Sequence, residues 1–190
     1  PIIFPELHAS IGENIQGPSL IKVSSWIPSP LGKYYLYFPL KDQTDIFRIG
    51  VAIGDKPEGP FKPLEAPMKG SFSIDPCLFK DDDNTHYMYF GGLWGGQLQR
   101  YRDGKAIECG AEPEDQEPAL PPRIAKLSDN MLEFAEVSKP IMILDDEGKP
   151  LTAGDHDRRF FEASWMHKYN NTYYFSYSTG NTHKLCYATG

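Results

Sequence analysis

Residues 170–177, NNTYYFSY, decide the fold class of this 190-residue chain. They read as a polar turn followed by an alternating strand rich in aromatic side chains. The same arrangement recurs at residues 31–38, LGKYYLYF, and at residues 84–90, NTHYMYF. Each copy follows a short apolar run and precedes another strand-like run, such as residues 47–52. Such repeated groups of strands are typical of the blades of a β-propeller.

The three copies predict an all-β fold with about three propeller blades. We expect one partial propeller domain over residues 1–190, with blade-like units at about residues 12–65, 66–127 and 128–190. An ordinary antiparallel sandwich would give similar alternation, but it has less reason to repeat the aromatic strand. Because no window keeps a sustained helical period, we expect no long helix.

A long insertion, residues 95–160, separates the second and third aromatic strands. Its acidic and proline-rich part, residues 103–122, indicates an exposed extended loop. Strand alternation returns at residues 123–127, and residues 140–144 predict a buried strand. The polar run at residues 145–149 then predicts a hairpin-like turn.

Composition limits the partners. The net charge of −7 with no cluster of Lys or Arg argues against a nucleic-acid partner. No apolar run is long enough to span a bilayer and no signal-peptide pattern is present, so we expect no membrane partner and a cytoplasmic location. Three cysteines without a Cys-x-x-Cys pair indicate neither a disulfide framework nor a zinc site.

Glu162 is the first candidate for catalysis. It lies between two phenylalanines and a tryptophan, just ahead of an aromatic strand. Apolar neighbours make ionisation costly and raise the pKa of a carboxyl group, as a general acid requires. On composition alone, a Glu at a strand end that is solvated or paired with Arg158 or Arg159 is the simpler interpretation.

Asp75 is a second carboxylate in a similar setting. It directly precedes Pro76 at the start of an apolar strand. Because proline restricts the residue before it, we expect an extended backbone at Asp75. The run of three acidic residues at 81–83 predicts a solvated hairpin turn, since it lacks the glycine and the distal glutamate of a calcium-binding loop.

The motifs around both carboxylates resemble those of glycoside hydrolase family 43. Residues 73–76, SIDP, and 87–92, YMYFGG, resemble its third blade. Residues 161–165, FEASW, and 173–178, YYFSYS, resemble its fourth. The resemblance covers about residues 38–190, and its motifs occur in the family's order.

The resemblance implies a five-bladed β-propeller with a site at its central axis. It also implies a β-xylosidase or α-L-arabinofuranosidase type of activity on plant polysaccharides or oligosaccharides that contain xylose or arabinose, by an inverting acid/base mechanism. On this resemblance, Glu162 would be the general acid. Asp75 would orient that acid and tune its pKa.

Four further residues are candidates for sugar binding. Trp94 is flanked by glycines, and its indole would stack on a sugar face, although a core tryptophan in a glycine-rich loop is equally expected. His156 and Arg159 precede Glu162 and would contact sugar hydroxyls, with a surface ion-pair cluster as the alternative. His183 would line the axis, or serve as an ordinary turn residue.

The chain also departs from the family pattern. The general base would be an Asp in the first blade, but no Asp precedes Asp42, and the earlier carboxylates Glu6 and Glu13 lie in segments that do not match. The chain stops at Gly190, where a fifth blade should begin. We therefore expect a partial or recombined chain. The alternative function is a non-catalytic propeller fragment or pseudo-enzyme that binds sugar or assembles with copies of itself.

The same residues and the family resemblance also lead to expectations about cofactors, ligands and partner chains. We expect no cofactor, while the resemblance allows an axial calcium or sodium ion. The expected ligand is a xylo- or arabino-oligosaccharide. Because three blades leave open sheet edges and an apolar flank, we also expect a homo-oligomer or a complementing propeller chain.

Overall fold

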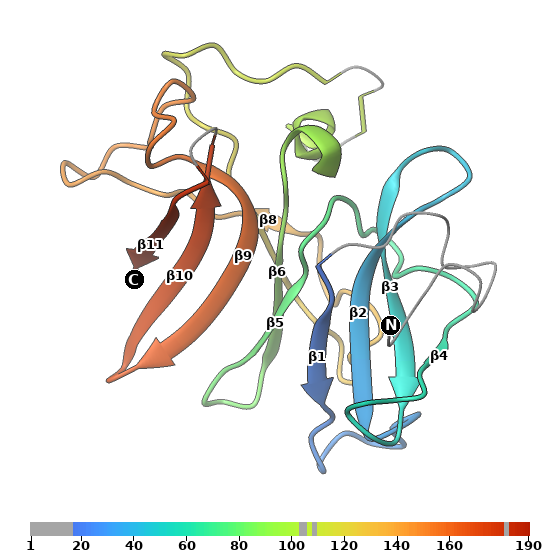
Figure 1. Cartoon of the computed structure of the whole chain (residues 1–190). Coiled ribbons are helices and arrows are strands. Elements are labelled where there is room, and N and C mark those ends of the chain that lie inside the picture. Colours follow the sequence, from blue (N-terminus) through green and yellow to red (C-terminus); the bar gives the residue numbers. More distant parts are fainter. Residues whose placement is uncertain (1–16, 103–105, 108–109, 181–182) are drawn as a thin grey trace.

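The computed structural model describes residues 17–102, 106–107, 110–180 and 183–190. Its strands form three antiparallel sheets that stand side by side (Figure 1). Each sheet is a simple meander in which strands adjacent in sequence are hydrogen-bonded. Within the described residues the only helices are two short 3₁₀ turns, η3 (Trp94–Gly96) and η4 (Leu98–Tyr101), so the all-β prediction is confirmed.

The strands divide among the sheets as follows. The first sheet contains β1 (Ser19–Lys22), β2 (Tyr34–Lys41), β3 (Phe47–Gly54) and β4 (Lys62–Pro63). The second contains β5 (Cys77–Lys80), β6 (His86–Phe90), β7 (Arg123–Lys126) and β8 (Lys139–Pro140). The third contains β9 (Phe160–Tyr169), β10 (Thr172–Thr179) and β11 (Leu185–Thr189).

The aromatic strands predicted from the sequence are β2, β6 and β10, the second strand of each sheet. Their inward side chains form one continuous core between the sheets, in which β1 contacts β5 and both β5 and β6 contact β9. Tyr37, Met88 and Phe160 are almost completely buried there. Burying a large apolar side chain contributes about 1.5–3 kcal/mol, so these strands hold neighbouring sheets together.

A polar contact joins the second and third sheets at the turn between β5 and β6. The predicted hairpin turn is confirmed, since Asp81 N–H donates to the carbonyl of Thr85. Its carboxylates are not merely solvated. Lys168 Nζ lies 2.8 Å from Asp82 Oδ2, and the Tyr173 hydroxyl lies 2.8 Å from Asp81 Oδ2. The acidic turn therefore anchors β9 and β10.

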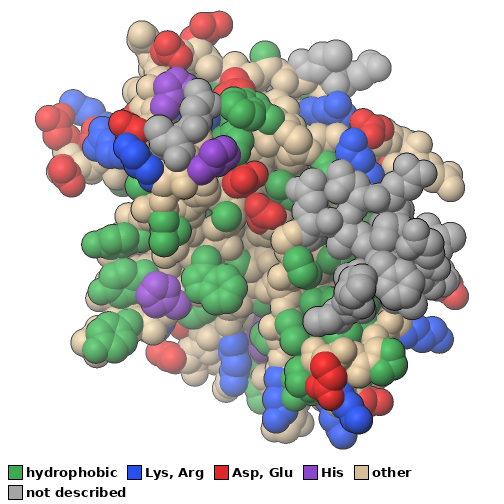
Figure 2. All heavy atoms as spheres, viewed as in Figure 1, with side chains coloured by type: hydrophobic (Ala, Val, Ile, Leu, Met, Phe, Trp, Pro, Cys, Tyr) green, Lys and Arg blue, Asp and Glu red, His purple; other side chains and the backbone are tan. Residues whose placement is uncertain are grey.

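The outer face of the third sheet is apolar and exposed. Figure 2 shows hydrophobic side chains gathered over this sheet on the face in view. Leu185 and Tyr187 of β11 are 82% and 68% exposed, and Trp165 and Tyr169 of β9 are also exposed. Among the described residues this sheet has three strands where the other two have four. Its β11 edge and this face are open to association.

Two details of the insertion differ from expectation. The second sheet extends past the expected boundary at residue 127, because β8 pairs with β7. The prediction of a buried strand at residues 140–144 is wrong, since β8 ends at Pro140 and both Met142 and Leu144 are exposed. The turn at residues 145–149 is confirmed by the hydrogen bond from Asp145 N–H to the Lys149 carbonyl.

No helix in the described part of the chain has the length and apolar character needed to cross a bilayer.

Candidate active site

The two candidate carboxylates come from neighbouring sheets. Asp75 lies two residues before β5, and Glu162 lies near the start of β9 rather than ahead of a strand. Asp75 Oδ2 accepts a hydrogen bond of 2.9 Å from the backbone N–H of Ala163, the residue after Glu162. The structure therefore brings Asp75 and Glu162 together, while their catalytic roles stay predictions.

A β-bulge sets the direction of Glu162. In the pairing of β9 with β10, Trp165 lies opposite Ser176, whereas Glu162 lies opposite Ser178. The chain therefore advances three residues on β9 for two on β10. Ala163 lies in this irregular stretch of β9 and has a φ of 61°. Bulges re-aim side chains and are common beside active sites. Here the bulge places Glu162 beside Asp75.

Gly92, in the loop after β6, closes the site from a third direction. A Cβ at Gly92 would lie 3.4 Å from the Cβ of Glu162 and only 2.6 Å from the Ile74 side chain. Glycine is therefore needed for the loop to approach this closely. The Gly92 N–H donates to Ser73 Oγ at 3.0 Å, which fixes the loop beside the segment that carries Asp75.

The surroundings of Asp75 favour its protonated form. Burial, and to a lesser extent the neighbouring Glu162 carboxylate, raises the pKa of Asp75 from 3.8 to about 6, although the Ala163 N–H opposes the shift. Gly17 contributes to this burial, because a Cβ on it would lie 2.4 Å from Asp75 Oδ1. Two adjacent carboxyl groups do not both ionise readily in such a place. Asp75 can therefore hold a proton to about pH 6.

Positive backbone φ angles gather in the segments that form this site. Ser73, Asp75, Trp94, Ala163 and His183 have φ values of 62°, 55°, 50°, 61° and 47°. The prediction of an extended backbone at Asp75 is wrong, because the hydrogen bond to Ala163 and the close packing of Gly17 hold the residue in the left-handed region. Such residues cost free energy and tend to occur at functional sites.

An aromatic row runs beside Glu162. The indole of Trp94 packs edge-to-face on Phe161, with ring centroids 4.9 Å apart. The same Phe161 packs edge-to-face on His183 at 5.4 Å. Trp94 remains 49% exposed, so it is not a core tryptophan. Trp94 and His183 therefore both contact Phe161, the residue before Glu162.

Arg159 occupies a different position from the one expected. It is only 2% exposed, and its Nε lies 3.3 Å from Nδ1 of His156, which is exposed. Its Nη2 lies 3.4 Å from Glu112 Oε2. The guanidinium therefore holds His156 and Glu112 from an enclosed position, and its contact with sugar hydroxyls stays a prediction. His156 keeps access to solvent.

Glu112 was missed in the sequence. Its side chain meets Arg159, and its other carboxylate oxygen accepts a hydrogen bond from the indole N–H of Trp94. The acidic, proline-rich composition around Glu112 indicated only an exposed loop. No sequence signal pairs it with residues so distant along the chain.

Metal ligands in proteins converge in groups of His, Cys, Asp and Glu side chains. No group of three His, Cys, Asp or Glu side chains converges within the described residues. The axial ion that the family resemblance allows stays an expectation.

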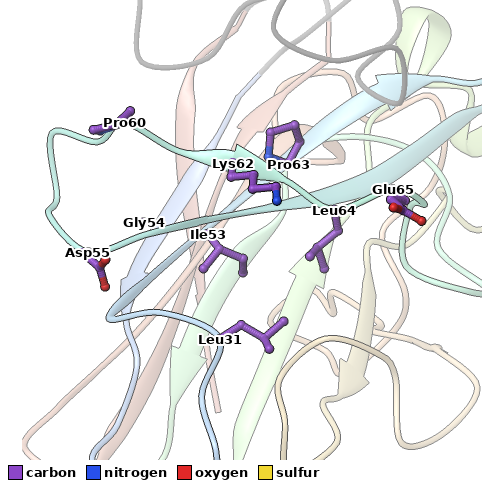
Figure 3. A pocket seen from close by; sticks show the side chains of 9 residues that line it. All are labelled: Leu31, Ile53, Gly54, Asp55, Pro60, Lys62, Pro63, Leu64 and Glu65. Carbon is purple, nitrogen blue, oxygen red and sulfur yellow. The ribbon is translucent and has the colours of Figure 1, made fainter.

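A roomy cavity lies away from this site. A hollow of about 710 Å³ opens between the loop at Leu31 and strands β3 and β4, with Ile53, Pro60 and Leu64 in its wall (Figure 3). It contains none of the candidate catalytic residues. The candidate active site is therefore identified by its carboxyl pair, Asp75 and Glu162, and not by this cavity.

Antiparallel sheets packed side by side around an aromatic core, with a carboxyl pair and an exposed tryptophan between two of them, define a β-propeller with a polar site. The sequence model of glycosyl hydrolases family 43 matches residues 26–117, a range that includes Asp75. A curated "Xylosidase/arabinosidase" of Bacteroides ovatus is 69% identical over 159 residues, or 84% of this chain. The chain belongs to glycoside hydrolase family 43.

Solved structures agree over nearly the whole chain. A family 43 enzyme from Xanthomonas citri, complexed with xylose, is 46% identical and superposes on 100% of this chain with a TM-score of 0.91. A β-xylosidase/α-arabinofuranosidase from a compost metagenome, complexed with xylotriose, is 57% identical over 94% of this chain, with a TM-score of 0.85. The chain spans about half the length of the proteins it matches, 49% of the Bacteroides relative and 55% of the Xanthomonas chain.

The first carboxylate of the described residues belongs to a turn. Asp42, the first Asp of the chain, lies in the turn after β2, where Oδ1 accepts from Thr44 and Oδ2 from Arg48. It is a structural turn residue. Glu6 and Glu13 lie outside the described residues.

Proposed function

We propose that this chain forms the acid-bearing part of a glycosidase site that hydrolyses O-glycosyl bonds in xylose- or arabinose-containing oligosaccharides. The observation that carries the proposal is the pairing of Asp75 and Glu162 beside the exposed Trp94. The xylosidase and arabinosidase names of the relatives support the substrate class. Xylose bound to the Xanthomonas enzyme supports a pentose ligand.

In this reaction Glu162 donates its proton to the leaving glycosidic oxygen. Asp75 holds the segment that carries Glu162 in place by accepting the hydrogen bond of the Ala163 N–H. Trp94 offers its indole face to a sugar ring. An inverting enzyme then needs a carboxylate base about 6.5–9.5 Å from the acid, with a water molecule between the base and the sugar.

We further propose that a second copy of this chain, or another propeller chain, completes the site. The exposed apolar side chains of the third sheet, among them Trp165 and Leu185, support an association surface there. Mass measured in solution by light scattering tests this part. A stable monomer at micromolar concentration, with full activity, would contradict it.

The hydrolysis test uses xylobiose and an aryl α-L-arabinofuranoside, with the first anomer of the product followed by proton NMR. We expect turnover with inversion at the anomeric carbon. Release of the retained anomer would contradict the mechanism. A chain that binds xylotriose without any turnover would instead support the non-catalytic sugar-binding alternative.

A further inference from the structure

Glu112, in the acidic segment of the insertion, contacts the site. Each of the two carboxylate oxygens of Glu112 has its own partner. One accepts from the indole N–H of Trp94, and the other lies 3.4 Å from the guanidinium of Arg159. These partners are 18 and 47 residues away along the chain. A single side chain therefore joins the insertion, the loop after β6 and the segment before β9.

Arg159 needs such a partner. Its side chain is 3% exposed, while that of Glu112 is 32% exposed. A buried guanidinium is costly unless a carboxylate faces it and hydrogen bonds satisfy it. Glu112 supplies that charge at the edge of solvent, and His156 Nδ1 accepts from Arg159 Nε. The ion pair thus fixes the carboxylate of Glu112 in one orientation.

Trp94 has few other restraints. Its φ of 50° is unfavourable for an L-residue, and it lies in a loop with glycines on both sides. One edge rests on Phe161 at 4.9 Å, and about half of its surface is open. The bond to Glu112 is the polar contact that sets the rotation of the indole. Without it, the aromatic contact alone would hold the ring.

We propose that Glu112 is a positioning residue that holds Trp94 as a platform for a pentose ring of the substrate. This inference rests on the proposed function, and it gives a role to the acidic insertion that the reaction itself does not require. The carboxylate acts through Trp94 and Arg159, without contact to the reacting atoms. It sets how firmly a xylo-oligosaccharide binds rather than how fast its bond breaks.

The first test measures the indole directly and needs no sugar. The chain has three tryptophans, so Trp26→Phe and Trp165→Phe leave Trp94 as the only tryptophan, which light at the red edge of its absorption excites without the tyrosines. In this background, Glu112→Ala should lower the time-resolved fluorescence anisotropy of Trp94, because the ring gains local motion. Glu114→Gln, a neighbouring change without a contact to Trp94 or Arg159, is the matched control. Unchanged anisotropy in Glu112→Ala would overturn the proposal.

The second test measures binding and turnover with xylotriose. We expect Glu112→Gln and Glu112→Ala to raise Kd and KM about tenfold and to leave kcat and its pH profile near the parent values. In a Trp94→Phe background, which lacks the indole N–H, Glu112→Gln should have a much smaller effect. A fall in kcat at constant KM, or equal effects in both backgrounds, would overturn the positioning role.

The two tests separate this inference from the proposed function. If the parent chain neither binds nor hydrolyses xylotriose, the proposed function fails, and the anisotropy alone decides whether Glu112 positions Trp94. If the parent binds and turns over xylotriose while every Glu112 variant behaves like Glu114→Gln, the proposed function stands and the role of Glu112 is refuted.

Discussion

The carboxylate of Asp75 and the backbone N–H of Ala163 are joined by a hydrogen bond of 2.9 Å between two different sheets. Ala163 is the bulged residue of β9, so this bond links the loop before β5 to the distortion that aims Glu162. The link depends on a backbone conformation that an L-residue adopts at a cost of about 1–2 kcal/mol. The site is thus maintained by the packing of two sheets rather than by local sequence preference.

The conformation of Ala163 makes a first prediction. Ala163→Val should lower the free energy of unfolding by about 1–2 kcal/mol, because a β-branched side chain fits a positive φ poorly. Ala163→Gly should be close to neutral, since relief of strain offsets the greater freedom of glycine when unfolded. Urea denaturation measures both. Ala135→Val, at an exposed position without a positive φ, is the control. Equal losses for the two valine variants would refute the strain argument.

The raised pKa of Asp75 makes a second prediction, about stability and pH. Because the folded value of about 6 lies above the ordinary 3.8, the native state binds more protons between these two values. Stability should therefore fall as pH rises through this window, by on the order of 1–2 kcal/mol after allowance for solvent screening. Asp75→Asn keeps an acceptor for Ala163 and removes the charge, so its unfolding free energy should not show this fall.

Urea denaturation at about pH 4 and about pH 7 compares the two proteins across this window. Asp146→Asn changes an exposed turn carboxylate and serves as the control. Parallel pH profiles for the parent and Asp75→Asn would show that the Asp75 carboxyl does not hold its proton in the folded protein.

The contact between Lys168 and the acidic turn makes a third prediction. Hydrogen bonds to Asp82, and then to Tyr173, raise the pKa of Lys168. Its contribution to stability is therefore present below the ordinary value of 10.5 and is lost as pH rises through the higher folded value. At neutral pH, Lys168→Met should lower Tm by about 1–3 °C, and less at high salt.

Differential scanning calorimetry at low and high salt measures this change. Lys139→Met removes a lysine from an exposed pair with Glu136 and is the matched control. If both variants have the same small effect on Tm, the contact does not join the second and third sheets.

The strands were predictable because their signals are local. An aromatic strand after a polar turn specifies a β-hairpin wherever it occurs, and three copies indicated three sheets. The wrong strand at residues 140–144 shows the limit of this reasoning. An apolar run becomes a strand only if a partner strand is free to bond it, and past Pro140 none of the described strands pairs with it.

The site was predictable only in part. The motifs around Asp75 and Glu162 indicated the carboxyl pair, but neither the bulge at Ala163 nor the left-handed backbone of Asp75 has a local signal. Pro76 even predicted the opposite conformation. The role of Glu112 depends on contacts with Trp94 and Arg159 that only the folded chain creates. Long-range contacts of this kind leave no trace in composition.

The last prediction concerns Glu162 and the leaving group. If Glu162 protonates the departing oxygen, Glu162→Gln should slow hydrolysis of xylobiose by about 10²–10⁴-fold, the range of general acid catalysis. A dinitrophenyl β-xyloside should lose far less, because its leaving group departs without a proton. Glu58→Gln, at an exposed turn after β3, is the control for loss of charge. The slope of rate against leaving-group pKa should therefore steepen only in Glu162→Gln. A uniform loss across all leaving groups would assign Glu162 a structural role, and an active Glu162→Gln with xylobiose would remove it from the reaction.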